Sequence, residues 1–452
     1  MVNLRNKTAM VWDGGLFLSI AARLSKDFGR VLYTTPWTQG GYPAPNAHLI
    51  GHGVEGVERV TNPWDHVEDA DIHIFLDVYD SDIQRYLVEQ GKYVWGCVGS
   101  DWLELDRDRS KQESKKAGID IGGYKKIIGL DALRVHLKKN KNQFVKISTL
   151  RGAFETFAAP SYQEIESRLD DLENKMGAFK KIAEFIVEDE IPDAVEIGYD
   201  GYSIDGGFAR GAIVGVEQKD KAYLGRTMRY SSLPENVREV NDKLSPILKR
   251  EGHRGFISTE IRETKDGHAY LIDPCQRAGS PPSELYQNLI GNLGEVIWYG
   301  AQGLMIEPEY TDKWGAEVLL ISEWADTHWQ HVKFPEEFAD NVKLRNFCVI
   351  DGETFVIPQN AGAPEIGAVV ATGPTAAAAI RECKRIAEMV DGYSIEKPIE
   401  ALDKAKEELD KALGGKADKP VPKEQATAEE AMRAGKISSK QYDKIAAREG
   451  WV

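Results

Sequence analysis

The chain has 452 residues, more than one hydrophobic core usually supports, so its length predicts two or three packed domains. Hydrophobic residues make up 42% and charged residues 29% of it, with no apolar run long enough to span a bilayer, so we expect a globular cytoplasmic protein without a membrane partner. The formal net charge of -15 argues against a nucleic-acid scaffold. The scattered cysteines form no CxxC pair, which is typical of free thiols in a reducing compartment; they are Cys97, Cys275, Cys348 and Cys383.

Residues 1–105 alternate short apolar strands with helical patterns, which predicts an open, mostly parallel α/β domain. Strands are predicted at 8–12, 30–34, 71–77 and 92–96, and helices at 15–29 and 81–91. The turn "WDGG" after the first strand lacks the GxGxxG spacing of a dinucleotide site. We therefore interpret Gly14 and Gly15 as a tight turn, with a phosphate site as the alternative.

From residue 106 onward the chain combines basic and acidic segments with short strands. A charged helix precedes the strand "NQFVKIST", which carries Lys146 in its middle. Taken alone, this lysine is either an edge-strand side chain that reaches to solvent or a ligand for an anion. The next loop, "TLRGAFET", contains a glycine and Arg151, which is typical of segments that fold over phosphates. Further on, an apolar strand runs into the acidic segment 188–191 and ends at Pro192.

The stretch "GFISTEIRETKDGHAYLIDPCQR" has the pattern of a β-hairpin. Its Asp-Gly pair at 266–267 favours a two-residue turn, and counting outward from that turn places Glu260 opposite Asp273. Two carboxylates opposite each other repel, and magnesium held by one or two carboxylates plus phosphate oxygens would relieve the repulsion. The hairpin therefore predicts a magnesium site, with a solvated surface hairpin as the alternative. Leu271 and Cys275, two residues on either side of Asp273, are expected on the same face.

The order of these segments resembles that of the ATP-grasp superfamily: a basic helix, a "VK" strand, a glycine-bearing loop, an acidic hinge and a hairpin ending in an acid-x-Asn-x-Arg motif. Within the superfamily, "YLIDPCQRAGSPPSE" is similar to the acid-x-Asn-x-Arg-x-Gly-Asp-Pro-Glu segment of phosphoribosylamine-glycine ligases. The resemblance spans roughly residues 1–395 and implies a mixed α/β and α+β protein with the ATP-grasp fold. It implies a Rossmann-like pre-ATP-grasp domain at 1–105, an ATP-grasp domain of two subdomains at 106–305 and a small C-terminal α+β domain at 306–398.

The resemblance also implies cofactors and site residues. ATP and Mg²⁺, or Mn²⁺ in its place, are the implied cofactors. Arg107, Lys146 and Arg151 would contact the phosphates, and Arg277 would stabilise the charge that develops in phosphoryl transfer. Glu260 and Asp273 would be the metal ligands.

The resemblance also implies contacts to the nucleoside. The hinge that meets the adenine edge through its backbone would be Glu188, Asp189, Glu190 and Ile191. Glu196 would bind the ribose hydroxyls, and Leu271 would lie under the base.

The implied activity is that of an ATP-dependent carboxylate-amine ligase, which forms a C-N bond between small molecules through an acyl phosphate. Two departures from the family pattern concern the site itself. Cys275 stands where an asparagine completes the magnesium shell, and a thiol is a poor ligand for this hard cation. "AGSPPSE" replaces the Gly-Asp-Pro-Glu segment that meets the amine-bearing substrate. A degenerate ATP-grasp protein that only binds nucleotide, or that acts as an interaction protein, is therefore the alternative.

The C-terminal residues are predicted to lie apart from these domains. Residues 399–425 combine an exposed helix with a linker, "GGKADKPVPKEQ". The tail at 426–452 has two short helices that open with capping boxes, Thr427 with Glu430 and Ser438 with Gln441. Such short helices bury little by themselves. We interpret the tail as a docking or self-association element for a protein partner, with a disordered tail as the alternative.

Overall fold

The computed structural model of the chain describes residues 2–36, 38–39, 42–43, 46–148, 156–192, 194–360 and 362–413. Arg151, residues 414–425 of the predicted linker and the predicted tail at 426–452 lie outside these residues. None of the helices within the described ranges is both long enough and apolar enough to cross a bilayer.

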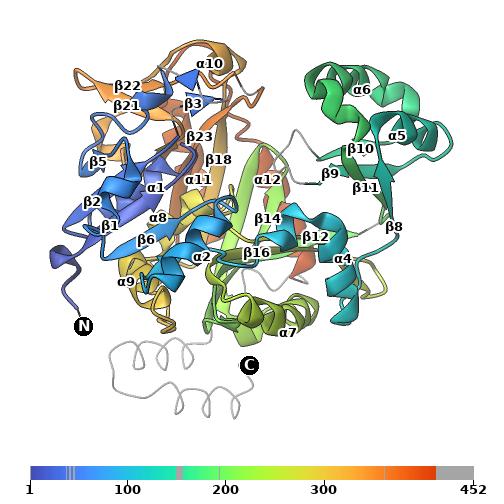
Figure 1. Cartoon of the computed structure of the whole chain (residues 1–452), viewed down its shortest axis with the longest axis horizontal. Helices are drawn as coiled ribbons and strands as arrows, with labels where there is room; N and C mark the ends of the chain where they lie inside the picture. Colours follow the sequence, from blue (N-terminus) through green and yellow to red (C-terminus); the bar gives the residue numbers. More distant parts are fainter. Residues whose placement is uncertain are drawn as a thin grey trace.

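The first domain is a parallel five-stranded sheet in the order β5-β2-β1-β6-β7, at the left of Figure 1. Its strands are β1 (Thr8–Trp12), β2 (Arg30–Thr34), β5 (Val57–Arg59), β6 (Ile72–Phe75) and β7 (Val94–Trp95). The strands are apolar on both sides because α1 (Leu18–Leu24) and α2 (Ser81–Glu89) pack against opposite faces. The predicted parallel α/β domain is confirmed.

A smaller lobe stands apart at the upper right of Figure 1. Its sheet has the order β10-β9-β11-β8 and is covered on one face by α5 (Leu130–Leu137) and α6 (Tyr162–Met176). The strands are β8 (Tyr124–Ile128), β9 (Gln143–Ile147), β10 (Thr156–Ala159) and β11 (Glu184–Asp189). Because the helices cover the face that holds Val145 and Val187, the other face, with Lys146 and Glu188, is turned away from them.

The largest element is a nine-stranded sheet in the order β17-β16-β12-β14-β15-β18-β23-β20, with β13 beside β12. Its strands are β12 (Val195–Ile204), β13 (Gly207–Phe208), β14 (Gly211–Gln218), β15 (Ala222–Arg229), β16 (Arg254–Glu263), β17 (Ala269–Cys275), β18 (Trp314–Ile321), β20 (Val342–Leu344) and β23 (Glu365–Gly373). One face packs toward the first domain together with α8 (Ser283–Leu289) and α9 (Leu293–Gly300). The sheet runs without interruption across the predicted domain boundary between 305 and 306, and the division into domains stays a prediction.

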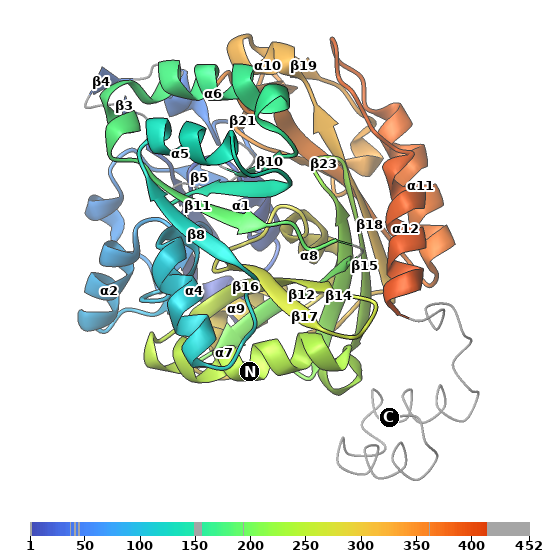
Figure 2. The ribbon, with the colours of Figure 1, turned by 90° about the vertical axis from the view of Figure 1, so that its right-hand side faces the viewer.

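The other face of this sheet is covered by α7 (Glu235–Arg250), α11 (Ala376–Met389) and α12 (Ala401–Ala412), the last two visible side by side in Figure 2. The helix predicted after residue 399 is therefore present as α12, but the prediction that it is exposed is wrong. Leu402, Ala405 and Leu409 recur every three to four residues and are fully buried against β14 and β15.

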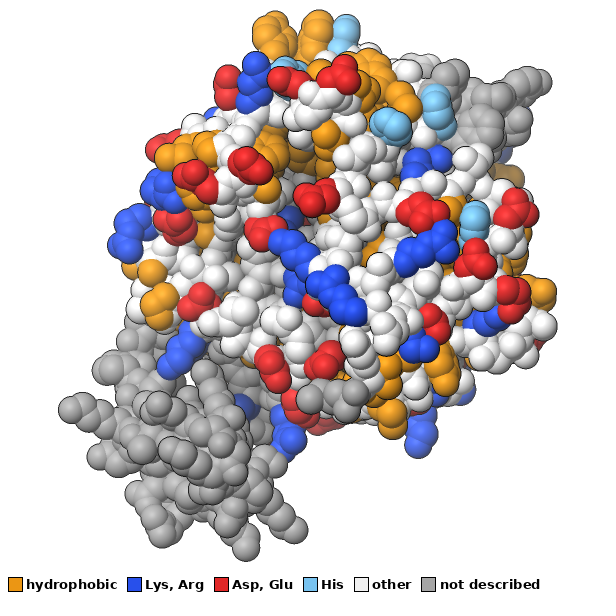
Figure 3. Space-filling view, turned by 90° about the vertical axis from the view of Figure 1, so that its left-hand side faces the viewer, with side chains coloured by type: hydrophobic (Ala, Val, Ile, Leu, Met, Phe, Trp, Pro, Cys, Tyr) orange, Lys and Arg blue, Asp and Glu red, His pale blue; other side chains and the backbone are white. Residues whose placement is uncertain are grey.

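The remaining elements are short. They are the hairpin β3 (Thr38–Gln39) and β4 (Tyr42–Pro43), the three-stranded sheet β19 (Gln330–Val332), β22 (Glu353–Val356) and β21 (Phe347–Ile350), and the helices α3 (Trp102–Leu105), α4 (Arg107–Lys116) and α10 (Glu323–Thr327). On the face shown in Figure 3, acidic and basic side chains are intermixed rather than gathered by sign.

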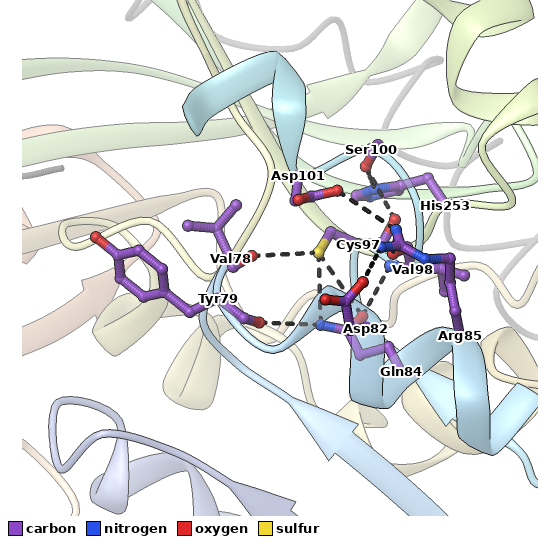
Figure 4. Close-up of polar contacts among 10 residues, drawn as sticks. All are labelled: Val78, Tyr79, Asp82, Gln84, Arg85, Cys97, Val98, Ser100, Asp101 and His253. Carbon is purple, nitrogen blue, oxygen red and sulfur yellow. Dashed lines mark hydrogen bonds and ion pairs between the residues drawn. The ribbon is translucent and has the colours of Figure 1, made fainter. Parts of the chain in front are cut away.

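A buried polar joint connects the first domain to the nine-stranded sheet (Figure 4). Gly96, just after β7, forms a β-bridge with Arg254 at the start of β16. Ser100 Oγ lies 2.8 Å from His253 Nδ1, and the Gln84 side chain accepts a 2.7 Å hydrogen bond from the Val98 backbone. The joint holds the loop that leads into α3 and α4, and α4 begins at the predicted site residue Arg107.

Candidate nucleotide site

The hairpin of β16 and β17 places Glu260 opposite Asp273, as predicted. The path to this register differs from the predicted one. The turn holds three residues between Thr264 and His268, whose backbones are joined by a 2.9 Å hydrogen bond, so the predicted two-residue turn is wrong. A β-bulge that adds Ile272 to β17 then restores the register.

The same bulge moves Leu271 to the other face of the sheet. Leu271 pairs with Ile261, and both side chains are buried in the core beneath α7. The prediction that Leu271 shares a face with Asp273 is therefore wrong, because the extra residue shifts the two-residue alternation by one. Cys275 pairs with Ser258 and stays on the face of Asp273.

A cavity of about 20 Å³ lies where α4 and the smaller lobe meet β17, which is an edge strand. This volume holds about one water molecule, so ATP fits only after the lining side chains move apart. The lining is formed by Leu103, Arg107, Ser110, Lys111, Ser114, Ile121, Lys146, Glu188, Leu271, Ile272, Asp273 and Pro274. Predicted residues from four separate segments therefore meet at one place.

Lys146 is buried and paired rather than turned to solvent. Its Nζ donates a 2.9 Å hydrogen bond to the Ile272 carbonyl and lies 3.2 Å from Asp273 Oδ2 and 3.4 Å from Glu188 Oε2. Burial alone would lower the pKa of Lys146, but the two carboxylates raise it above its ordinary value, so the lysine is charged. The alternative of an edge-strand lysine that reaches to solvent is wrong, since β9 is also an inner strand.

Arg107 provides the second cation at Asp273. It begins α4, where the Asp106 side chain accepts a hydrogen bond from the Arg109 backbone and so caps the helix. Arg107 Nη1 lies 2.9 Å from Asp273 Oδ1. Burial alone would raise the pKa of Asp273, but Lys146 and Arg107 hold it well below its usual range. Lys146 and Arg107 therefore both compensate the negative charge of Asp273.

Lys111 is a site residue that the sequence interpretation missed. It lies one turn after Arg107 on α4, and its Nζ is 2.6 Å from Glu188 Oε1. Burial lowers the pKa of Lys111, although Glu188 opposes the shift. The spacing of four residues from Arg107 places both side chains on the same helix face, which is a signal the sequence contains.

The predicted adenine hinge lies at the end of β11. Glu188 is buried, lines the cavity and contacts Lys111 and Lys146 through its side chain. The Asp189 backbone donates to the Gly123 carbonyl and the Glu190 backbone to the Asn142 carbonyl, both within 3.1 Å. Ile191 lies two residues after the end of the strand and is partly exposed.

Glu260 and Glu196 lie on neighbouring strands of the nine-stranded sheet. Burial raises the pKa of Glu260, against the effect of Lys219. Glu196 is 41% exposed and lies 3.7 Å from Arg262 Nε. Within the described part of the chain, no three His, Cys, Asp or Glu side chains are grouped closely enough to hold a metal ion alone. A magnesium ion at Glu260 and Asp273 would therefore depend on phosphate oxygens for its remaining ligands.

Arg277 follows β17 and is fixed by α3. Its Nε donates a 3.0 Å hydrogen bond to Glu104 Oε1, while Glu104 Oε2 accepts from the Gln276 backbone at 2.9 Å. Burial alone would lower the pKa of Arg277, but Cys275 and Glu104 raise it above its ordinary value. The guanidinium is therefore protonated and positively charged. The remaining predicted phosphate contact, Arg151, lies outside the described residues.

The two lobes, the parallel first domain and the acid-bearing hairpin together define the ATP-grasp fold. The solved structures that match the chain have this fold. One is the phosphoribosylamine-glycine ligase of Thermotoga maritima, with a TM-score of 0.61 and 17% identity over 86% of this chain and 98% of that one. Another is the biotin carboxylase domain of a Hydrogenobacter thermophilus 2-oxoglutarate carboxylase, solved with MgADP, with a TM-score of 0.61 and 14% identity over 88% and 92%.

A third match is the N5-carboxyaminoimidazole ribonucleotide synthetase of Thermotoga maritima, with a TM-score of 0.54 and 16% identity over 86% of this chain and 99% of that one. No protein-family model and no curated protein sequence matches the chain. At these identities the matches establish the fold, which is the one the motif order implied.

Proposed function

We propose that the protein is an ATP-dependent carboxylate-amine ligase that works through an acyl phosphate. The observation that carries the proposal is the convergence of Arg107, Lys111 and Lys146 on one cavity. Arg107 and Lys146 pair there with Asp273 of the hairpin, and Lys111 pairs with Glu188 of the smaller lobe. Three clustered cations suit a triphosphate, and carboxylates beside them suit the magnesium that accompanies it. The residues present therefore fit Mg-ATP, once the ion pairs to Asp273 have rearranged.

In this proposal each group of residues has one task. Bound Mg-ATP supplies the phosphoryl group that activates the substrate carboxylate. Lys146, Arg107 and Lys111 hold the phosphates, and Arg151 is proposed to contact them as well. Glu260 and Asp273 hold Mg²⁺ or Mn²⁺ against the phosphates. The hinge at 188–191 and Glu196 position the base and ribose, and Arg277, braced by Glu104, stabilises the charge that develops during transfer.

The test is Mg-dependent phosphate release by the full chain against pools of small carboxylic acids and amines. We expect release that requires ATP, one acid and one amine together, and that is lost in Lys146→Met. A matched control is Lys139→Met, an exposed lysine on the same lobe, which should retain wild-type turnover. Release that is the same with and without the amine would contradict a carboxylate-amine ligase.

The second candidate is a nucleotide-binding protein without ligase activity. It is favoured by Cys275, which lies on the metal-binding face in place of an amide. This candidate predicts ATP binding by calorimetry with no turnover in any pool. Cys275→Asn would then raise the affinity for Mg-ATP, because an amide oxygen suits magnesium better than sulfur.

A further inference from the structure

Asp200 is a buried acid, on the face of the nine-stranded sheet that carries Glu260, which the proposed nucleotide site does not use. It lies on β12 two residues after Gly198, the residue that pairs with Glu260. Because side chains two residues apart share a face, Asp200 points to the same side of the sheet as Glu260. In the next row of that face, Cys275 pairs with Ser258 and Ser258 pairs with Asp200. Asp200 therefore lies one row from the proposed metal ligands.

The carboxylate of Asp200 is held by Tyr223 on β15, which reaches it across β14. Tyr223 Oη donates a 2.5 Å hydrogen bond to Asp200 Oδ2, and both side chains are buried. The ring lies over two glycines that pair with each other, Gly215 and Gly225. A Cβ at Gly215 would come within 1.9 Å of Tyr223 Oη, and one at Gly225 within 2.8 Å of the ring. The two glycines thus make room for the hydrogen bond that fixes this acid.

A second buried acid, Glu317 on β18, belongs to the same group. Glu317 pairs directly with Tyr223 across the sheet, so the two side chains share a face, and it lies within electrostatic reach of Asp200. Both carboxylate oxygens of Glu317 are buried and make no hydrogen bond to the described residues. Buried polar atoms normally have a hydrogen-bond partner, so Glu317 is suited to meet polar atoms of a ligand beside Asp200.

The surroundings of the two acids separate their pKa values. The groups near Asp200 are Tyr223 from β15, Ser258 from β16, Tyr286 from α8 and Glu317 from β18. Burial and Glu284 raise the pKa of Glu317 well above its usual range, which favours its neutral form. Burial raises the pKa of Asp200 to only about 6, because the hydrogen bond from Tyr223 opposes the shift. At neutral pH Asp200 is therefore the charged acid of the pair, which is the arrangement of a base beside a neutral acid.

The row that contains Asp200 also leads to the proposed phosphoryl-transfer residue. Arg277 lies two residues after Cys275, and Cys275 is close enough to raise the pKa of Arg277. Cys275 in turn begins the row that continues through Ser258 to Asp200. A carboxylate substrate activated beside Arg277 would therefore lie next to this row.

The proposed reaction needs a group that accepts a proton. The nitrogen lone pair of the amine attacks the acyl carbon, and the bond from this carbon to the phosphate oxygen breaks with its electron pair on phosphate. The nitrogen then carries one proton too many for an amide. A carboxylate with a pKa just below neutral pH accepts such a proton and later releases it to solvent.

We propose that Asp200 is the general base of the ligase reaction, whose carboxylate takes the proton from the amine nitrogen as this nitrogen bonds to the acyl carbon. Tyr223 holds the carboxylate in place. This inference rests on the proposed ligase function and adds a catalytic residue to it.

The test separates activation of the acid from attack by the amine. The full chain receives Mg-ATP and pools of carboxylic acids, with either amine pools or hydroxylamine. Hydroxylamine is unprotonated at neutral pH and traps an acyl phosphate as a hydroxamate without help from a basic side chain. Asp200→Asn, which keeps an acceptor for Tyr223, should lose amide formation by about a hundredfold or more and retain wild-type hydroxamate formation.

The matched control is Asp242→Asn. Asp242 lies on α7, on the other side of the sheet, and likewise accepts a hydrogen bond from a tyrosine, Tyr230 Oη at 2.9 Å. This variant should retain both reactions. Wild-type amide formation by Asp200→Asn overturns the inference. Loss of both reactions in a folded Asp200→Asn protein also overturns it, because a base for the amine is not needed to form the acyl phosphate.

Tyr223→Phe is a second variant, which keeps the acid and its burial. Loss of the hydrogen bond raises the pKa of Asp200, so the pH below which amide formation declines should move upward from about 6. Hydroxamate formation should keep its wild-type pH profile. An unchanged profile of amide formation in Tyr223→Phe overturns the inference.

The carboxyl group can also be followed without substrates. Infrared difference spectra of wild type against Asp200→Asn should show a carboxylate that titrates near pH 6. A carboxylate that titrates near the ordinary aspartate pKa of 3.8 overturns the inference.

The two proposals fail separately. A wild-type protein that forms neither hydroxamate nor amide removes the ligase proposal and this inference with it. A wild-type protein that forms both, together with an Asp200→Asn variant that does the same, removes only this inference.

Discussion

Asp273 lies at the centre of the proposed nucleotide site, where it contacts both Arg107 and Lys146. The repulsion expected from Glu260 is reduced, because Lys146 and Arg107 pair with Asp273 while burial raises the pKa of Glu260 and favours its neutral form. The charges that would bind Mg-ATP are thus held in internal ion pairs. Nucleotide and metal must replace these pairs together, since phosphate takes the cations and magnesium takes the acid.

Replacing Lys146 by methionine should weaken ATP binding at least tenfold, about 1.4 kcal/mol, because the variant keeps the volume of the side chain but removes the positive charge that is proposed to bind the phosphates. Calorimetry of ATP binding checks this, with Lys139→Met as the control. Unchanged affinity in a folded variant would leave Lys146 with a purely structural role.

Replacing Asp273 by asparagine should destabilise the metal-free protein by about 3 kcal/mol, because it leaves Lys146 and Arg107 as buried cations without their shared partner. It should also remove the magnesium-dependent part of the stabilisation by ATP. Urea unfolding measures both effects. Asp170→Asn, which breaks an exposed pair with Arg134, should cost less than 1 kcal/mol. A stabilised Asp273→Asn protein would mean that repulsion from Glu260 dominates after all.

At the scale of elements, the hairpin and α12 show how local patterns and packing combine. The hairpin reaches the predicted pairing through a wider turn and a compensating bulge, so its two acids meet while Leu271 changes faces. In α12, charged residues suggested exposure, but the apolar residues among them form one buried stripe. Asp403, Lys404 and Glu407 lie on the exposed side of the helix, while Glu408 accepts a 2.7 Å hydrogen bond from the Gln218 side chain of the sheet.

Replacing Leu409 by alanine should lower the free energy of unfolding by about 3 kcal/mol, because the side chain is fully buried against the sheet. Lys404→Ala, on the exposed side of the same helix, should change it by less than about 0.5 kcal/mol. Denaturant unfolding distinguishes the two, and similar values for both would contradict the packing of α12.

Truncation after Leu413 removes the predicted tail and keeps α12. The thermal midpoint and ATP binding should remain nearly unchanged, while the oligomeric state or capture of a partner should change. Light scattering and thermal unfolding check this. Unfolding of the truncated chain would show that the tail belongs to the core.

At the scale of the whole molecule, stability depends on the buried joint between the first domain and the nine-stranded sheet. His253 is fully buried there, beside Ser100 and the Gly255 carbonyl. Burial lowers the pKa of His253 to about 4. The unfolded chain therefore binds this proton first as the pH falls, and the stabilising contribution of neutral His253, complete above pH 6.5, is lost toward pH 4.

His253→Asn, which keeps a hydrogen-bonding side chain but cannot titrate, isolates this effect. The difference in unfolding free energy between wild type and variant should shrink by about 3 kcal/mol between pH 6.5 and pH 4. Urea unfolding across this range measures it. Parallel curves for the two proteins would show that His253 does not titrate on unfolding.

Much of the fold was open to prediction because it depends on local patterns. The parallel first domain and the "VK" strand follow from alternation and turn residues, which neighbours in sequence decide. The pairing of Glu260 with Asp273 was predicted correctly, but the turn on which the prediction rested was wrong and a bulge compensates for it. The order of these segments implied the ATP-grasp fold. The roles of the site residues stay predictions, since they depend on ligands.

Only the tertiary structure decided which charges meet. The ion pairs of Lys146 with Asp273 and of Lys111 with Glu188 join residues 127 and 77 positions apart, and no local pattern encodes such distances. The same holds for the burial of α12 against the nine-stranded sheet. Sequence patterns specify which faces are apolar, but the partners of a buried charge are set by how whole layers pack.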